Sequence, residues 1–241
     1  MKAIILAAGE GKRLRPLTDN RPKCMVEYRG KSIIDQILLV MRNSGLHDIT
    51  LIKGYCADKL VREGTRELVN ERYASTNMVR TLFCSENGWD DDIIISYADI
   101  VYEQYILEAL IEETSDFSVV VDKDWKSLWQ KRMCDPLKDA ETLKLDKDNN
   151  IVELGRKPSG YHEIVGQYIG LIKIKKNITD RIREFYHSLD QTEEYNGKDF
   201  DNMFMTTFIQ LVIDRLMPVK AVIISGGWVE IDTIDDLRNL S

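Results

Sequence analysis

Short apolar runs alternate with amphipathic segments along the chain, and this alternation constrains the fold more than any other feature of the sequence. Residues 3–8, 93–96 and 117–121 are apolar runs of the length expected for buried strands. Residues 32–44 and 103–112 instead repeat their apolar side chains at helical spacing. Strands that alternate with helices predict a mainly parallel sheet, because each helix returns the chain to the edge at which the next strand starts. We therefore expect an α/β fold with helices on both faces of the sheet.

The middle of the chain, residues 122–166, is its least regular part. It carries many charges together with Trp125 and Trp129, and two strand-like segments separated by a polar turn at 146–150. No internal repeat, low-complexity tract or flexible linker divides the 241 residues. We therefore predict one domain, residues 1–241, with an insertion around 122–166 that faces the substrate. Further helices are predicted at residues 57–63, 77–86, 177–189, 200–216 and 233–240.

The average charge argues against nucleic acid and membranes as partners. The chain has 33 Lys and Arg against 40 Asp and Glu, a net charge of −7, whereas binding to nucleic acid or anionic lipid usually leaves a basic footprint. The opening apolar run is too short for a signal peptide, and no run reaches the roughly 18 residues of a membrane-spanning helix. Four widely spaced cysteines predict reduced thiols and a cytoplasmic location. Three scattered histidines argue against a zinc site or a histidine-centred triad.

The first candidate for chemistry is the loop that follows the first predicted strand. It contains two glycines and three basic side chains, Lys12, Arg13 and Arg15. Glycines let the backbone approach a ligand closely, free N–H groups hold phosphate oxygens, and arginines add paired charged contacts. A P-loop is excluded because Arg13 stands in the Ser/Thr position, and a dinucleotide fingerprint because Leu14 stands at the third glycine. The loop indicates phosphate binding, with a plain turn carrying solvated charges as the alternative.

Three further residues are placed to act on a phosphate. Lys23 follows a proline and precedes an apolar segment, which fits a positioned point charge on a triphosphate, although most lysines are ordinary surface residues. Asp99 and Asp232 each follow a predicted strand, at the edge where α/β sheets bind ligands. Together they could hold one Mg²⁺ opposite the basic loop. Each is also a plausible helix-capping or turn residue.

The opening motif, continued by Pro22 and Lys23, resembles the G-x-G-x-R-(apolar)-x-P-(apolar)-T…P-K signature of the sugar-phosphate nucleotidyltransferases. The likeness extends over nearly the whole chain, through Tyr73, Asn77 and residues 228–232 in the family's order. It is strongest to the small cytidylyltransferases, which load phosphocholine, phosphonates or phosphoglutamine with CMP. The segments that favour the phosphoglutamine branch are residues 22–28, 76–79, 94–102, 139–144, 167–171 and 202–208.

The resemblance implies a Rossmann-like nucleotidyltransferase fold with a mixed, mainly parallel sheet, and a Mg²⁺-assisted transfer of CMP from CTP that releases pyrophosphate. The attacking phosphate oxygen is already anionic, so positioning and charge neutralisation matter more than a strong base. By resemblance Lys23 and Arg13 are catalytic, and Asp99 and Asp232 hold the metal. The nucleotide-binding residues implied are Leu6, Ala8, Gly9, Gly11, Lys12, Gly54, Tyr55 and Asn77.

The acceptor pocket is expected in the insertion, which contributes candidates of both charge signs. The expected acceptor-binding residues are Lys123, Trp129, Arg132, Glu141 and Lys144, with Trp125 and Lys157 as further candidates. Phosphoglutamine would need charged partners for its amine and its carboxylate, whereas phosphocholine would need aromatic faces around a quaternary ammonium. Each of these side chains could equally be packed or solvated without a role.

The sequence leaves alternatives for the kind of protein, for the nucleotide and for the oligomeric state. A phosphocholine or phosphonate cytidylyltransferase, and a sugar-1-phosphate nucleotidyltransferase using UTP or dTTP, are the alternative enzymes. A catalytically silent nucleotide-binding subunit is a third possibility, against which the set Lys23, Asp99 and Asp232 argues. Selectivity for CTP follows only from the resemblance, as does a role in capsule or surface polysaccharide modification. A homodimer is allowed, but the sequence does not require one.

Overall fold

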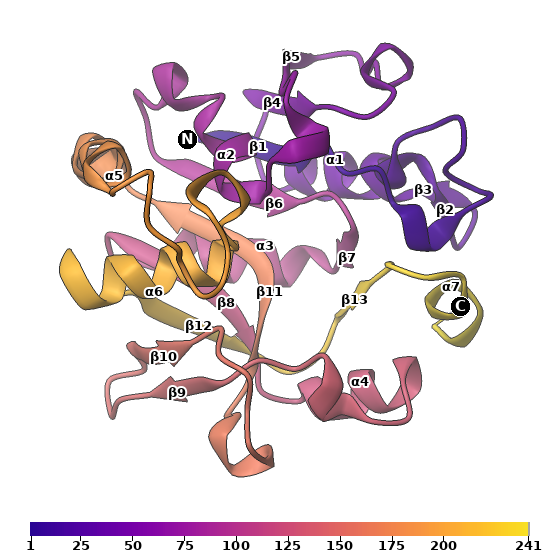
Figure 1. The fold of residues 1–241 in the computed structure, drawn as a ribbon. Coiled ribbons are helices and arrows are strands. Elements are labelled where there is room, and N and C mark those ends of the chain that lie inside the picture. The colour runs from indigo at the N-terminus through magenta and orange to yellow at the C-terminus, as the bar shows by residue number, and fades with distance from the viewer. Residues whose placement is uncertain (241) are drawn as a thin grey trace.

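The computed structural model describes residues 1–240, and its centre is a seven-stranded mixed sheet in the order β12-β8-β11-β6-β1-β4-β5 (Figure 1). Strand β11 runs antiparallel to both of its neighbours, and the other pairs in this sheet are parallel. The strands are β1 (Lys2–Ala7), β2 (Glu27–Tyr28), β3 (Lys31–Ser32), β4 (Ile49–Lys53), β5 (Thr65–Val69), β6 (Ile93–Tyr97), β7 (Ile100–Tyr102), β8 (Phe117–Asp122), β9 (Leu143–Leu145), β10 (Ile151–Leu154), β11 (Gln167–Ile174), β12 (Lys220–Ile224) and β13 (Trp228–Glu230). The helices are α1 (Ile33–Asn43), α2 (Met78–Phe83), α3 (Gln104–Glu112), α4 (Trp125–Arg132), α5 (Lys176–Ser188), α6 (Met205–Arg215) and α7 (Ile234–Asn239).

Helices cover both faces of the sheet, which explains why residues 3–7 of β1 are all apolar. Ala3, Ile5 and Ala7 point into a core shared with α1, α3 and α4. Ile4 and Leu6 point into the opposite core, shared with α2, α5 and α6. The predicted α/β class and the mixed, mainly parallel sheet are confirmed.

The last part of the chain returns to the first. Strand β13 pairs with β7, and α7 lies between the β2–β3 hairpin and α4 (Figure 1). The Tyr28 hydroxyl donates to the carbonyl of Leu240 at 2.5 Å, which ties this end to the hairpin. This return brings Asp232 back to the loop after β1. Within residues 1–240, no helix is long and apolar enough to cross a membrane.

Three predicted helices are shorter in the structure than the sequence suggested. Residues 57–63 form only a single 3₁₀ turn, Ala57–Lys59, because the Leu60 carbonyl accepts from Lys53 Nζ at 3.0 Å instead of continuing a helix. The helix predicted at 77–86 ends at Phe83, where Ser85 turns the chain by donating to the Leu82 carbonyl at 2.7 Å. The helix predicted at 200–216 is divided into a 3₁₀ turn, Phe200–Asn202, and α6.

Candidate active site

The loop after β1 packs tightly against the segment that carries Lys23. Gly11 has φ of +66°, and a Cβ added to it would lie 2.9 Å from Lys23 Cβ. The Gly11 carbonyl accepts from the Leu14 N–H at 2.9 Å and from the Thr18 hydroxyl at 2.8 Å. Any other residue at position 11 would be strained in backbone and would press on Lys23. The glycine therefore sets how closely Lys23 approaches the loop.

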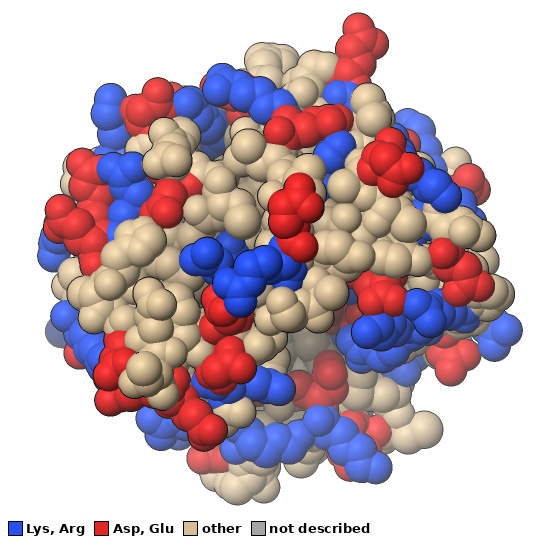
Figure 2. Space-filling view, turned by 45° about the horizontal axis from the view of Figure 1, so that its top comes forward, with Lys and Arg blue, Asp and Glu red and all other residues tan. Residues whose placement is uncertain are grey.

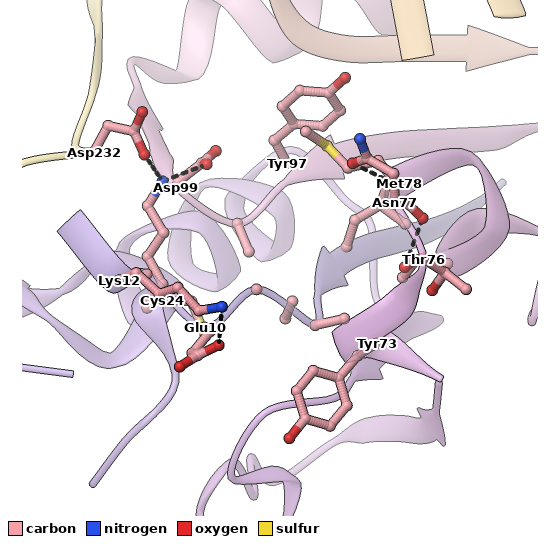
Figure 3. A pocket seen from close by; sticks show the side chains of 18 of the residues that line it. Glu10, Lys12, Cys24, Tyr73, Thr76, Asn77, Met78, Tyr97, Asp99 and Asp232 are labelled. Carbon is pink, nitrogen blue, oxygen red and sulfur yellow. Dashed lines mark hydrogen bonds and ion pairs between the residues drawn. The ribbon is translucent and has the colours of Figure 1, made fainter. Parts of the chain in front are cut away.

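A cavity of about 430 Å³ lies beside this loop, beyond the carboxyl ends of β1 and β6 (Figure 3). Asp99 and Asp232 face one another on one side of it, Asn77 and Tyr73 lie on the other, and Tyr97 lies between (Figure 3). This is the edge at which α/β sheets bind ligands. The predicted nucleotide, catalytic and metal residues that line it are Leu6, Ala8, Gly9, Gly11, Lys12, Arg13, Lys23, Asn77, Asp99 and Asp232.

Lys23 lies between the two aspartates. Its Nζ is 2.7 Å from Asp99 Oδ2 and also forms an ion pair with Asp232 Oδ1. Burial by itself lowers the pKa of Lys23, but the Asp99 and Asp232 carboxylates, helped by Glu230, more than offset this and hold the pKa above its ordinary value. Lys23 is therefore a fixed positive charge on the floor of the cavity.

The other two basic side chains of the cavity reach into solvent. Lys12 is 74% exposed and lies 3.2 Å from Glu10, and Arg13 is 65% exposed and forms an ion pair with Asp232. Exposed pairs of this kind are weak and easily exchanged. Lys12 and Arg13 are thus free to turn toward a phosphate.

The two aspartates fit a magnesium ion held partly by substrate. Asp99 Oδ1 is buried and has no hydrogen-bond partner among residues 1–240. Over the same residues, no group of three or more His, Cys, Asp or Glu side chains is placed to hold a metal alone. Mg²⁺ usually takes one or two carboxylates and completes its shell with water and phosphate oxygens, so Asp99 and Asp232 suffice.

The side of the cavity opposite the aspartates differs from the prediction in two residues. Asn77 lines the cavity and caps α2, accepting from the Met78 N–H at 2.8 Å. Gly54 and Tyr55 are not in the lining. Gly54 allows the close approach of Tyr73, since a Cβ there would lie 2.6 Å from Tyr73 Cβ, and Tyr55 N–H donates to the Ala8 carbonyl at 3.2 Å. They support the wall that Ala8 and Tyr73 form, and no signal at the sequence level distinguishes that role from ligand contact.

Several lining residues were not predicted as site residues. They are Ala7, Glu10, Cys24, Tyr73, Ala74, Thr76, Met78, Thr81, Tyr97 and Ala98. Most of them lie one or two positions from a predicted residue in the sequence. Their closeness to predicted residues was therefore the only sequence feature that could have indicated them.

A second cavity of about 200 Å³ adjoins the first, and Met78 and Tyr97 line both. Two of the predicted acceptor residues, Trp129 and Glu141, line this second cavity. Burial raises the pKa of Glu141 to about 7.

Arg132 lies elsewhere, in a buried ion-pair network that joins α4 to the end of the chain. Its guanidinium donates to Glu230 at 2.6 Å and to Asp236 at 2.9 Å, and its side chain is only 3% exposed. It also stacks 5.3 Å above the Trp129 ring, while Trp125 meets Trp129 edge to face. The prediction placed Arg132 and the two tryptophans in the acceptor site, whereas the structure packs Arg132 and Trp125 as core residues outside the two cavities.

The three predicted lysines do not line either cavity. Lys123 is exposed at the start of the insertion, and Lys144 Nζ lies 3.1 Å from Glu153 and 3.6 Å from Glu163. Lys157 donates to the backbone carbonyls of Leu137 and Lys138. They are distributed over the outside of the insertion, and the structure does not bring them together.

Comparison with known proteins shows the family of the chain. The family model described as nucleotidyl transferase matches residues 2–111. A CTP:phosphoglutamine cytidylyltransferase from Campylobacter jejuni is 44% identical over 249 aligned positions, which cover 99% of this chain and 98% of the relative. The chain belongs to the nucleotidyl transferase family and is an enzyme of that class.

Solved structures share the fold. The inositol-1-phosphate CTP transferase from T. maritima has a TM-score of 0.75 at 20% identity, covering 98% of this chain and 90% of its own. The CTP:phosphocholine cytidylyltransferase from Streptococcus pneumoniae has a TM-score of 0.73 at 22% identity, covering 99% and 96%. At these identities the likeness concerns the fold.

Proposed function

We propose that the chain is a Mg²⁺-dependent cytidylyltransferase that transfers CMP from CTP to a small phosphorylated acceptor, with phosphoglutamine as the acceptor. The observation that carries the reaction is the cluster of Lys23, Asp99 and Asp232 on the floor of a cavity edged by a glycine loop. The near full-length likeness to the Campylobacter jejuni enzyme supports the choice of nucleotide and acceptor.

In this reaction an oxygen of the acceptor phosphate attacks the α-phosphorus of CTP, the bond to the β-phosphate oxygen breaks, and pyrophosphate leaves. The backbone of Gly9 and Gly11 faces the phosphates, and Arg13 and Lys12 neutralise the departing end. Lys23 provides its fixed charge where the two reacting phosphates meet. Asp99 and Asp232 would hold Mg²⁺, which would supply further charge neutralisation at the phosphates.

The resting structure is compatible with this arrangement. Three acidic and three basic side chains line the cavity, namely Glu10, Asp99, Asp232, Lys12, Arg13 and Lys23. A triphosphate adds about four negative charges, so the bare lining does not balance it and a divalent cation is needed.

Nucleic acid and membranes are not proposed as partners. On the face drawn in Figure 2, acidic and basic side chains intermingle instead of gathering into an area of one sign. Exposed thiols at Cys84 and Cys134 support a cytoplasmic place of action, since such thiols persist in a reducing compartment. By the likeness to its relative we also propose a role in capsule or surface polysaccharide modification.

The test is an acceptor panel with each of CTP, UTP, dTTP and ATP in the presence of Mg²⁺, read by pyrophosphate release and by the mass of the nucleotide adduct. CTP with phosphoglutamine should give the CMP adduct. Turnover only with UTP or dTTP and a sugar phosphate would move the chain to the sugar-1-phosphate enzymes. Absence of pyrophosphate release with every phosphoglutamine, phosphocholine, phosphonate and sugar phosphate would refute the proposal.

A further inference from the structure

The second cavity has an unusual charge. Its lining includes Asp139, Glu141 and Glu230, and no Lys, Arg or His among the described residues lines it. It shares Met78 and Tyr97 with the nucleotide cavity, so a ligand in one can extend into the other. A cavity with three acids and no base attracts a cation and repels an anion.

Two of the three acids already have firm partners. Glu230 accepts from Arg132 at 2.6 Å, and Asp139 accepts from the Trp129 indole N–H at 2.9 Å. Glu141 has only the Thr206 hydroxyl, at a long 3.3 Å. Glu141 is therefore the acid of this cavity with unused hydrogen-bonding capacity.

The backbone at Glu141 is nevertheless held firmly. Gln167 accepts from the Glu141 N–H at 3.1 Å and donates to the Glu141 carbonyl at 2.6 Å. The carboxylate thus projects from a fixed point on the edge of the cavity. A fixed, poorly satisfied carboxylate is preorganised for a ligand.

A buried hydroxyl lines the same cavity beside Glu141. The Tyr168 hydroxyl interacts with the hydroxyl of Tyr97, which also lines the cavity, and electrostatically with Glu141. A primary ammonium, which has three N–H donors, can satisfy a carboxylate and a hydroxyl together, whereas a quaternary ammonium has no N–H donor at all.

We propose that the second cavity takes the end of the acceptor remote from its phosphate, and that Glu141 receives a primary ammonium there, so that the enzyme selects phosphorylated acceptors that carry an amine. This rests on the proposed function, and it deepens that function by assigning a residue to acceptor choice. The carboxylate of an amino-acid acceptor points toward the opening, away from the three acids. Aromatic side chains also line this cavity, namely Tyr97, Trp129, Tyr168, Phe204 and Trp228, so the distinction from phosphocholine rests on the N–H donors that Glu141 can accept and that a quaternary ammonium lacks.

The test uses two acceptors that differ only in the amine: phosphoglutamine, and the same compound with hydrogen in place of its α-ammonium. With the wild-type enzyme, loss of the amine should lower kcat/KM and direct binding affinity roughly 10- to 100-fold, the effect of one charged hydrogen bond. Glu141→Gln should lose a similar factor for phosphoglutamine, keep its KM for CTP, and discriminate weakly between the two compounds. Glu153→Gln, in the same insertion and outside both cavities, should match the wild type.

Equal binding of the two compounds by the wild-type enzyme, measured calorimetrically without CTP, would overturn the inference. So would a Glu141→Gln variant that keeps the wild-type discrimination. The comparison of the two acceptors uses only the wild-type enzyme. It therefore tests the inference even if the Glu141 variant fails to fold. Failure of the proposed function itself would look different, because no acceptor would then release pyrophosphate from CTP whatever the binding data gave.

Discussion

Lys23 and Asp99 form an ion pair that uses half of the carboxylate: Lys23 Nζ lies 2.7 Å from Asp99 Oδ2, while Asp99 Oδ1 is buried and has no hydrogen-bond partner in the described part of the chain. A buried carboxylate oxygen without a partner costs about 1–3 kcal/mol. Such a cost at the floor of a ligand cavity fits a group that a bound cation completes. The pairing therefore links the resting state of the site to its proposed chemistry.

Asp99→Asn should remove turnover with little effect on the fold. The amide keeps the shape but loses the charge that attracts a cation, so we expect a drop in kcat of roughly 10²-fold or more. Differential scanning fluorimetry should show that CTP with Mg²⁺ raises the Tm of the wild type and no longer does so for the variant. Asp235→Asn, an exposed aspartate in the last helix, is the matched control. Wild-type activity in Asp99→Asn would remove Asp99 from the mechanism.

Lys23→Ala should reduce stability as well as activity. Without the ammonium, Asp99 and Asp232 face one another with only the exposed Arg13 nearby, and removing one partner of a buried pair costs roughly 3 kcal/mol. Millimolar Mg²⁺ should restore part of that loss in the variant, and should stabilise the wild type less, because the cation replaces the missing charge. Urea unfolding with and without Mg²⁺ measures this. Lys12→Ala, at a 74% exposed lysine, is the control and should not change the unfolding free energy. An equal effect of Mg²⁺ on the stability of Lys23→Ala and of the wild type would contradict the reasoning.

The site residues that the sequence predicted are those marked by a local sequence pattern. The loop after β1, Lys23, Asp99 and Asp232 each stand directly beyond a predicted strand or in a short motif, so local pattern was enough to select them. In the structure these residues line one cavity.

The positions of the side chains in the insertion were harder to predict, because their contacts are with residues remote in sequence. Arg132 looked like a solvated or ligand-binding charge, yet its partners Glu230 and Asp236 lie 98 and 104 residues further on. The pairing of β7 with β13 was not predicted either. The two strands are remote in sequence, and each has only three residues. Side-chain type and spacing do not reveal which distant acid a given arginine meets.

Arg132→Ala should destabilise the protein strongly. Arg132 and Asp236 are each 3% exposed, and truncation would leave Asp236 and Glu230 without their partner and empty a space beside Trp129. Leaving a buried charge unpaired costs about 3–5 kcal/mol. Thermal and urea unfolding should show this loss, while Lys131→Ala on the same helix should change the unfolding free energy by under about 0.5 kcal/mol. A loss of acceptor affinity in Arg132→Ala with no loss of stability would instead return Arg132 to the acceptor site.

Glu141→Gln should make the protein more stable at neutral and alkaline pH. Burial raises the pKa of Glu141 to about 7, with Asp139 adding to the rise and the Thr206 hydroxyl opposing it, while Tyr97 and Tyr168 contribute uncharged hydroxyls. Because the unfolded state ionises near pH 4.5 and the folded state only near 7, the wild type loses stability as pH rises between these values, and the loss stays constant above pH 7.

The size of that loss sets the test. A rise from 4.5 to about 7 corresponds to roughly 3 kcal/mol. Glutamine cannot ionise, so the unfolding free energy of Glu141→Gln should match that of the wild type near pH 4.5 and exceed it by this amount at pH 8. Phosphoglutamine should reduce the difference at pH 8, because its ammonium stabilises the ionised carboxylate of the wild type only. Urea unfolding of both proteins at the two pH values, with and without the acceptor, measures each quantity. A wild type at least as stable as the variant at pH 8 would mean that Glu141 is already well satisfied without a ligand, and its selection of an amine would lose its physical basis.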